Sequence, residues 1–530
     1  MRFHTILAIL VALFAILTLL DRVQQVEVLA ARVVLPALVA LLQAGAMVAV
    51  GALLRRTWHV DLPLDFLIGY PVFGTLLFLV GLLKVSAWTM LPLLIAGLLG
   101  ALVLLLKWYG SDERRTRERT HVELRWPALF VFAVLAFGLA AAQRLPSFAD
   151  EVALHLAIPH TWALEEQVVE LPLLAGSYSP LGIESADLLP LTLLGRARGG
   201  LASHFLHWLA AVATTILIVR RTQSWLATAA IVTTPALAFA AGWSLIDWPL
   251  TGLFVALYVA LEDDSRNSAS AATAAGLLTS YAFVPFAIAA WVLKKRVPTW
   301  TALLGVVFFI RNFGEWPDLF RQRALALADY VFEAPFVEEA LGASLLVMPL
   351  FASGVIAVAA ALLALALFFF TPSARLLVPF LAVATMSAAP ALQRRLVSAI
   401  VAIAIVVQTF IVFATPREEP AQNATIDWLN LALPRDSRTL IVGLNETYSI
   451  LRKARGGDAE RVSRYLDLPS ADAVRDRLRS DGISHVALVE PANGEVQTLT
   501  PSAQRMLAQT LDRYAANVTS RGDVTLFTLR

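Results

Sequence analysis

The stretch "WPALFVFAVLAFGLAAAQRLPSFADEVALH" (residues 126–155) joins an apolar run to a cluster of ionisable side chains. The run from residue 126 to residue 142 carries no charge and is long enough to cross a bilayer. Asp150, Glu151 and His155 follow shortly after it. Ionisable groups are costly in or near lipid, so a cluster of them at this place suggests a functional role.

The composition of the whole chain is that of a membrane protein. Of its 530 residues, 58% are hydrophobic and only 15% are charged, and the mean hydropathy is +0.70. These values predict a polytopic all-α membrane protein. The net charge of +2 gives no reason to expect a nucleic-acid partner. The absence of cysteine excludes disulfides, thiolate metal sites and a cysteine nucleophile.

Basic residues between the apolar runs predict the topology by the positive-inside rule. We expect cytoplasmic loops at the basic positions 55–56, 107–125, 220–221, 294–296 and 393–395. The first run, residues 5–20, has no cleavage site after it and is interpreted as a retained span. Counting from a cytoplasmic N-terminus, residues 143–200 form a large outer loop, and the chain has about 13–15 spans.

Two apolar runs are interrupted. The run before Lys294 is broken near Ser280, Tyr281 and Pro285, which predicts two short half-spans that meet at the outer side. The run 341–370 is either one long tilted helix or a hairpin around Ser353 and Gly354. We favour the hairpin, because it lets residues 393–395 face the cytoplasm.

From Pro416 onward the composition becomes that of a soluble domain. Buried strands are predicted at 438–444, 484–490 and 524–529, and amphipathic helices at 470–482 and 501–516. These elements indicate a small α/β domain of about 110 residues. With the hairpin assignment, this domain lies outside the cytoplasm.

The outer loop is expected to carry two helices in the plane of the interface, at 151–167 and at 180–195, the second with Glu184 and Asp187 embedded. Several polar residues in or near apolar runs then share the outer face: Asp150, Glu151, His155, Glu184, Asp247, Arg311 and Arg375. Each alone could be satisfied by water among the lipid headgroups. A whole set on one face favours a site.

Short motifs in this part of the chain resemble the GT-C class of membrane glycosyltransferases, in particular bacterial relatives of the dolichyl-phosphate-mannose protein mannosyltransferases and the aminoarabinose lipid A transferases. The motifs are "ADEVALH" (149–155), "YSPLGIESADLL" (178–189), "TTPALAFAAGWSLIDWPL" (233–250), "LTSYAFVP" (278–285), "RN" (311–312) and "ARLLVP" (374–379). The resemblance covers roughly residues 126–530. The chain departs from the family pattern at Leu154, Ser280 and Leu376, where the family has polar or cationic groups.

The resemblance implies an enzyme of the cell envelope that moves a sugar from a polyprenyl-phosphate donor to a lipid, glycan or protein acceptor, with inversion, at the outer face of a bacterial inner membrane. It implies that Asp150 is the base and that Asp247 orients the sugar, the acceptor or Asp150. The implied substrate-binding residues are Glu151, His155, Glu184, Tyr281, Arg311 and Arg375, with the two arginines at the leaving phosphate. No cofactor is certain, but a divalent metal on Asp150, Asp247 and His155 is possible.

The sequence therefore predicts three parts: an N-terminal extension of four helices (1–125), a GT-C-like transmembrane core (126–415) and an extracytoplasmic α/β domain (416–530). Two other classes stay open. A transporter or flippase would place Asp150 and Asp247 in a cavity that opens alternately to both sides. A noncatalytic scaffold would keep the fold with a decayed site, and its His155, Arg311, Arg375 and Tyr281 would act as interfacial anchors.

Overall fold

The computed structural model describes residues 30–57, 60–110, 125–147, 150–312, 343–368, 374–414 and most of 424–530, with gaps in that last part at 435, 445–447, 449, 452, 457–458 and 490–498. The predicted first span and nearly all of the basic segment 111–125 lie outside the described residues. The chain divides into two compact units. The helical unit comprises residues 1–79, 87–146 and 180–417, and the α/β unit comprises 80–86, 147–179 and 418–530.

The described part of the helical unit is built from α-helices joined by short turns. Its α-helices are α3 (Leu35–Leu54), α4 (Leu62–Gly81), α5 (Ala87–Gly110), α6 (Ala128–Ala142), α8 (Leu188–Thr222), α9 (Trp225–Val232), α10 (Pro235–Ala240), α11 (Asp247–Glu262), α12 (Arg266–Leu277), α13 (Phe283–Leu293), α14 (Val307–Arg311), α16 (Ala343–Val347), α17 (Val355–Phe368), α18 (Val378–Ser387) and α19 (Arg395–Ala414). The 3₁₀ and π-helical turns are η1 (Ala30–Val34), η5 (Glu184–Asp187), η6 (Trp300–Val306), η9 (Met348–Phe351), η10 (Ala374–Leu377) and η11 (Ala389–Gln393).

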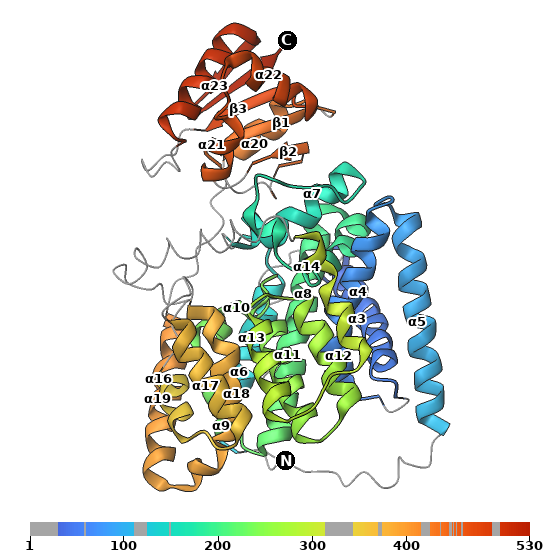
Figure 1. Ribbon diagram of the computed structural model, residues 1–530, viewed down its shortest axis with the longest axis vertical. Helices are drawn as coiled ribbons and strands as arrows, with labels where there is room; N and C mark the ends of the chain where they lie inside the picture. The colour runs from blue at the N-terminus through green and yellow to red at the C-terminus, as the bar shows by residue number, and fades with distance from the viewer. Residues whose placement is uncertain are drawn as a thin grey trace. The chain divides into compact units, whose positions relative to one another are not determined.

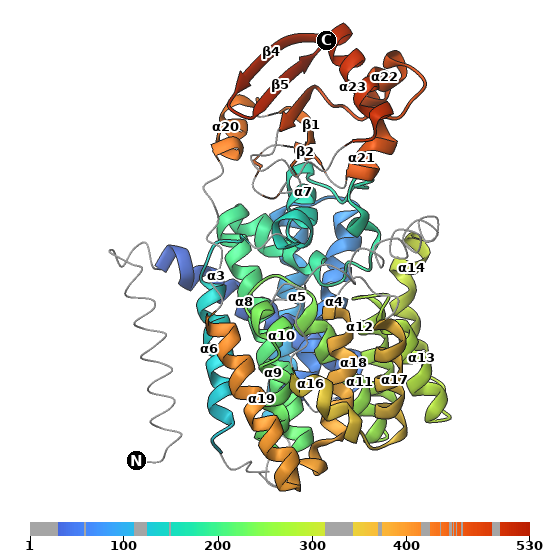
Figure 2. The same cartoon turned by 90° about the vertical axis from the view of Figure 1, so that its left-hand side faces the viewer.

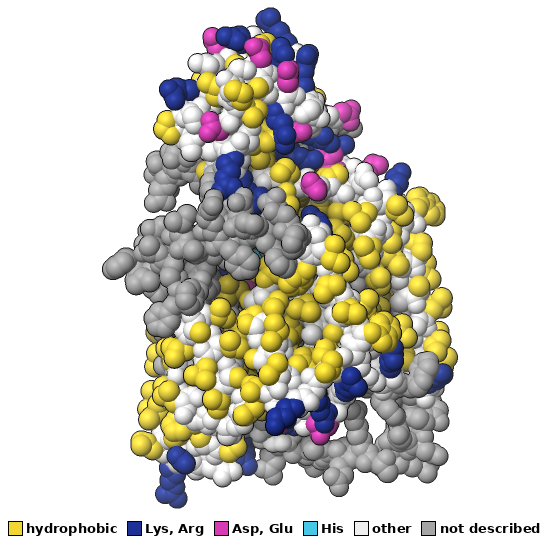
Figure 3. Space-filling view, viewed as in Figure 1, with side chains coloured by type: hydrophobic (Ala, Val, Ile, Leu, Met, Phe, Trp, Pro, Cys, Tyr) yellow, Lys and Arg dark blue, Asp and Glu magenta, His cyan; other side chains and the backbone are white. Residues whose placement is uncertain are grey.

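These helices have the length and composition of membrane spans. Four stretches are long and apolar enough to cross a bilayer: Arg32–Leu54, Leu62–Gly81, Ala87–Lys107 and Glu184–Thr222. Shorter apolar helices accompany them, and Figure 3 shows hydrophobic side chains over most of the visible face of the helical unit. The prediction of an integral, mostly helical membrane protein is confirmed, whereas the number of spans stays a prediction.

Helix α11 lies at the centre of this unit (Figure 1). It packs against α8, α12, α13 and α18, and nearly all of its side chains are buried. Phe254 stacks on Phe286 of α13, with ring centroids 4.5 Å apart, and meets Phe380 of α18 edge-on at 4.7 Å. Because aromatic pairs add geometry-dependent attraction to the burial of their area, this cluster fixes how α11, α13 and α18 meet.

Both predicted breaks are confirmed. Residues 278–282 separate α12 from α13. Residues 352–354 separate η9 from α17, and Gly354 there has φ +87°, a conformation that favours glycine.

The outer loop differs from its prediction, because α8 already begins at Leu188, well before residue 200. Gly195, at φ +73°, interrupts the helical geometry inside α8. The predicted helix at 180–195 therefore becomes the 3₁₀ turn η5 followed by a short first segment of α8. A glycine allows this kink because positive φ carries no penalty for a residue without Cβ.

Cations at predicted cytoplasmic loops gather at one end of the helical unit. Among the described residues, five of them pair with carboxylates there, in the pairs Arg55–Asp65, Arg220–Asp61, Arg221–Asp263, Lys294–Glu262 and Arg296–Asp264. Figure 3 shows Lys and Arg side chains gathered at one end of this unit. A cavity of about 830 Å³ is lined by residues from 125–127, 222–226 and 389–393. The predicted loop 393–395 therefore lies beside the residues that follow Arg221. The basic loops thus share a side, as predicted.

The α/β unit holds a five-stranded sheet of order β2-β1-β3-β5-β4 (Figure 2). Its strands are β1 (Arg438–Val442), β2 (Lys453–Arg455), β3 (His485–Val489), β4 (Ala515–Arg521) and β5 (Val524–Leu529). Strand β1 pairs in parallel with β2 and β3, and β5 pairs antiparallel with β3 and β4. Its helical elements are η3 (Glu151–His155), α7 (Ala157–Glu165), η4 (Ala175–Tyr178), α20 (Ala424–Ala432), α21 (Ala459–Leu466), α22 (Ala471–Ser480) and α23 (Pro501–Tyr514).

Helices cover both faces of this sheet. Leu440 and Val486 pack against α21, α22 and α23 on one face. Ile441 and Ala487 pack against α20 on the other. The three predicted strands and two predicted helices are confirmed, and β2, β4, α20 and α21 were not predicted.

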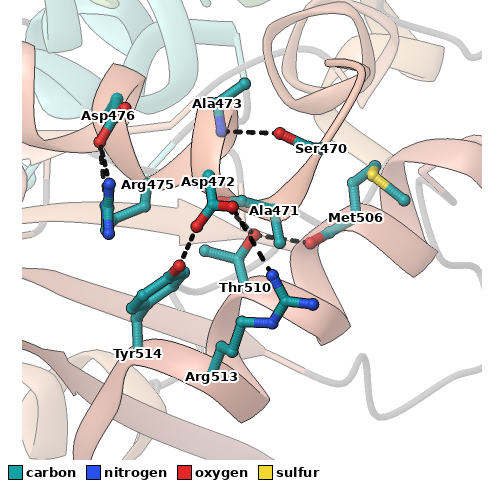
Figure 4. Close-up of polar contacts among 10 residues, drawn as sticks. All are labelled: Ser470, Ala471, Asp472, Ala473, Arg475, Asp476, Met506, Thr510, Arg513 and Tyr514. Atoms are coloured by element: carbon teal, nitrogen blue, oxygen red, sulfur yellow. Dashed lines mark hydrogen bonds and ion pairs between the residues drawn. The ribbon is translucent and has the colours of Figure 1, made fainter.

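Polar contacts join α22 to α23 on the solvent side (Figure 4). The Ser470 hydroxyl caps α22 by accepting from the Ala473 amide at 3.2 Å. Asp472, in the first turn, accepts from the Tyr514 hydroxyl and pairs with Arg513 at 3.7 Å. A carboxylate at this position also interacts favourably with the helix dipole.

Candidate functional site

The predicted site residues Asp247 and Tyr281 of the helical unit lie at the ends of helices. Asp247 is the first residue of α11, and Asp263, which pairs with Arg221, follows its last residue. Sixteen helical residues separate the two ends, a rise of about 24 Å. Tyr281 lies between α12 and α13, whose other ends carry Arg266 and Lys294. Asp247 and Tyr281 therefore lie at the end of the unit opposite the ion pairs of the basic loops.

The structure brings Asp247 and Arg375 together. The Nε atom of Arg375, on η10, lies 3.6 Å from Oδ1 of Asp247, and the two side chains are 15% and 9% exposed. At that separation the contact is an ion pair and not a hydrogen bond. The start of a helix also favours the Asp247 carboxylate. A largely buried guanidinium thus sits beside a fixed anion.

Helix α8 holds the loop that carries Asp247. The ring nitrogen Nδ1 of His207 lies 2.8 Å from the Leu245 carbonyl, so that it donates to that oxygen. Thr214 donates its hydroxyl to the carbonyl of Trp248 at 3.3 Å. The Trp248 indole in turn donates to the Leu237 carbonyl at 2.7 Å. These contacts on both sides of Asp247 fix its backbone.

Tyr281 and Arg311 lie close together at the same end. The amide of Asn312, the neighbour of Arg311, donates to the Tyr281 hydroxyl at 2.9 Å. The Arg311 guanidinium lies over the ring of Phe78, 5.3 Å from its centroid, a cation–π contact. The two motifs "LTSYAFVP" and "RN" thus meet in space.

Glu184 belongs to a buried polar cluster that the sequence did not reveal. Glu184, Asp187 and His207 are each less than 5% exposed. Nε2 of His207 lies 3.6 Å from Oδ2 of Asp187, and its ring meets that of Tyr70 edge-on at 5.6 Å. The pair of histidines at 204 and 207, three positions apart in an apolar run, was a signal that could have pointed to it.

The remaining predicted residues belong to the α/β unit. Asp150 precedes the π-helical turn η3 and is exposed, whereas Glu151 and His155 within the turn are buried. The Glu151 carboxylate accepts from the Ser147 amide at 3.3 Å. π-helical turns are rare and recur at functional sites. The expectation that Asp150 and Asp247 lie on the same outer face concerns residues of two units and stays a prediction.

Metal binding at the predicted ligands also stays a prediction. Within the ranges that the structure describes, no three His, Asp or Glu side chains come close enough to hold a metal ion. The Asp247 carboxylate lies beside the Arg375 guanidinium, and a cation beside a carboxylate weakens its affinity for a metal.

Similarity to known proteins is found among solved structures. No family model matches the chain, and no curated protein matches it. Among solved structures, ArnT from Cupriavidus metallidurans bound to undecaprenyl phosphate is similar at 13% sequence identity, with a TM-score of 0.48, over 76% of this chain and 97% of that chain. ArnT belongs to the transferases that the motifs resemble. At this identity and TM-score the similarity decides nothing about the reaction of this chain.

Proposed function

We propose that the protein is a GT-C-type glycosyltransferase that moves a sugar from a polyprenyl-phosphate donor to an acceptor at the extracytoplasmic face of the membrane, with inversion. The observation that carries this proposal is the Asp247–Arg375 pair, because it sets a largely buried guanidinium at the end opposite the basic loops. The positive-inside rule assigns those loops to the cytoplasm, so we expect the Asp247–Arg375 pair at the outer face.

The leaving phosphate of such a donor needs fixed cations. A guanidinium has five N–H donors, and Asp247 lies nearest the Nε of Arg375. The Asp247 carboxylate therefore orients the Arg375 guanidinium, a group whose N–H donors match the oxygens of a phosphate. Asp247 is a positioning residue in this proposal, and Arg311 adds a second cation.

Transfer to a hydroxyl also needs a base on the face of the sugar opposite the phosphate. We assign this role to Asp150, because it is an exposed carboxylate directly beside a π-helical turn. Glu151 and His155 lie buried in that turn and support its conformation. The acceptor is a hydroxyl-bearing lipid, glycan or protein.

The test uses the purified full chain in proteoliposomes with a panel of polyprenyl-phosphate sugars labelled in the sugar, together with host membranes as the source of acceptor. We expect the labelled sugar of one donor to be transferred to the acceptor, with release of polyprenyl phosphate. The Asp150→Asn variant should not carry out this transfer. If no donor in the panel is bound or consumed by the wild-type chain, the proposal is wrong.

A second candidate, a proton-coupled transporter, is favoured by the buried cluster of Glu184, Asp187, His207 and Tyr70. Ionisable groups inside membrane helices often mark ion or proton pathways. Uptake of a solute into proteoliposomes, driven by a pH gradient and abolished by Asp187→Asn, would support this candidate over the transferase.

A further inference from the structure

The register of the sheet in the α/β unit gathers three cations at its edge. Strand β2 is the edge strand, and Arg438 of β1 lies opposite Lys453 of β2, while Leu440 lies opposite Arg455. Because alternate residues of a strand share a face, Arg438, Lys453 and Arg455 all project to the same face. That face also carries Leu440, which packs under α21–α23.

One carboxylate is buried among these cations. Glu165, at the end of α7, is 3% exposed, and its oxygens lie 2.5 Å from Arg438, 3.0 Å from Arg455 and 3.7 Å from Lys453. Burial lowers the pKa of Arg455, since removing a cation from water disfavours its charge. Arg455 therefore gains from every further anion that comes near.

A cavity of about 270 Å³ opens beside this cluster within the α/β unit. Its polar walls are Glu170, Arg438, Arg455, Tyr465, Arg477 and Asp481. Asp481 is already engaged, because it accepts from the Tyr465 hydroxyl at 2.6 Å and lies 3.5 Å from Arg477. The volume is below the about 300–1,000 Å³ of sites for drug-sized ligands, so it suits a headgroup and not a lipid tail.

The charges around the cavity favour an anion. Three arginines line the cavity, Arg438, Arg455 and Arg477, and Lys453 lies beside them at Glu165. Against these four cations are three carboxylates: the buried Glu165, the engaged Asp481 and the solvent-exposed Glu170. Among the described residues, Nε of Arg438 and Nη1 of Arg455 are buried without a hydrogen-bond partner. The buried Oε1 of Glu165 also has no hydrogen-bond partner, so two unmatched donors stand beside one unmatched acceptor, and the cluster can take a further acceptor.

We propose that this cavity binds a phosphate group, carried either by a soluble sugar phosphate or by a lipid headgroup. Guanidinium groups suit phosphate because their N–H donors match its oxygens in pairs. None of the residues assigned to transfer lines this cavity, so its test needs no transferase activity.

The test measures binding to the purified full chain in phosphate-free detergent buffer, by calorimetry, with three probes: inorganic phosphate, glucose 6-phosphate and dioctanoyl phosphatidylglycerol. The variants are Arg477→Gln and Lys453→Gln, whose side chains are 52% and 37% exposed and are therefore replaceable without harm to the fold. Arg455 is left unchanged because its removal would take an ion-pair partner from the buried Glu165 carboxylate and destabilise the fold.

The matched control is Arg475→Gln. Arg475 lies on α22 two positions before Arg477, but it pairs with Asp476 and stacks on the Tyr514 ring (Figure 4). We expect saturable binding of inorganic phosphate that weakens about tenfold in Arg477→Gln, the loss of one charge-assisted hydrogen bond, and that is unchanged in the control.

Tighter binding of glucose 6-phosphate than of dioctanoyl phosphatidylglycerol would show that the phosphate group belongs to a soluble sugar phosphate. Tighter binding of the lipid would show that it belongs to a lipid headgroup. Absence of saturable binding for all three probes, or equal binding by Arg477→Gln, Lys453→Gln and the control, would overturn the proposal.

Discussion

The ion pair between Asp247 and Arg375 should be energetically coupled in spite of its length. Two unit charges 3.6 Å apart attract by about 5 kcal/mol at an effective dielectric constant of about 20. Desolvation of both groups cancels much of this, and no hydrogen bond forms at that distance. We therefore expect a double-mutant cycle of Asp247→Asn and Arg375→Gln to give a coupling of about 1–3 kcal/mol in the free energy of unfolding.

The measurement is denaturant unfolding of the purified protein in mixed detergent micelles. The matched control is the ion pair of Arg221 and Asp263. Its charged atoms are 2.9 Å apart, 0.7 Å closer than the 3.6 Å of Asp247 and Arg375, but its side chains are 33% and 54% exposed. Exposed pairs contribute little, so the control cycle should give less than about 1 kcal/mol. If the longer pair couples no more strongly than the shorter one, burial does not set the strength of these contacts and the reasoning fails.

Four further predictions follow from the assignments above. Asp150→Asn should lower turnover by about 10²–10⁴-fold with donor affinity almost unchanged; near-normal transfer by a folded variant would exclude it as the base. Arg375→Ala should weaken donor binding by about 2 kcal/mol, measured as the donor dissociation constant, because it removes a contact to the phosphate. A reporter fused after Arg530 should be active only outside the cytoplasm, and cytoplasmic activity would reverse the topology. Burial lowers the pKa of His485, so the α/β unit should become easier to digest with protease as the pH falls below about 6.5, the usual histidine value, while His485→Gln should lose this dependence.

Local patterns in the sequence predicted the local features of the fold. The break at Ser280 and Tyr281 and the break at Gly354 depend on residues that interrupt an apolar run, and a run is visible in a single window. The three strands at 438, 485 and 524 depend on compact apolar segments bounded by polar ones. The shared side of the basic loops follows from the positive-inside rule alone.

Features that depend on distant residues, or on weak patterns, were not predictable in the same way. Strand β4 is exposed along most of its length and lacks the alternation that marks a half-buried strand, so its first residues were assigned to the preceding helix. Asp187 was visible in the sequence, but its neighbours His207 and Tyr70 come from two other helices. The pairing of Asp247 with Arg375 needs α11 to lie beside η10 and α18, which no window of sequence can show.

The arginines of this chain differ in what their burial requires. Arg221 and Arg296, at the basic end, are exposed and paired with exposed carboxylates, so water alone would satisfy them and their main effect is on orientation in the membrane. Arg375 and Arg455 are only 15% and 14% exposed, and taking a guanidinium out of water costs several kcal/mol unless anions replace the solvent. The carboxylates of Asp247 and Glu165 offset part of that cost, and Nη1 of Arg455 is still buried without a hydrogen-bond partner. An enzyme that binds phosphate needs this kind of cation, held in place by one anion and completed by the oxygens of its substrate.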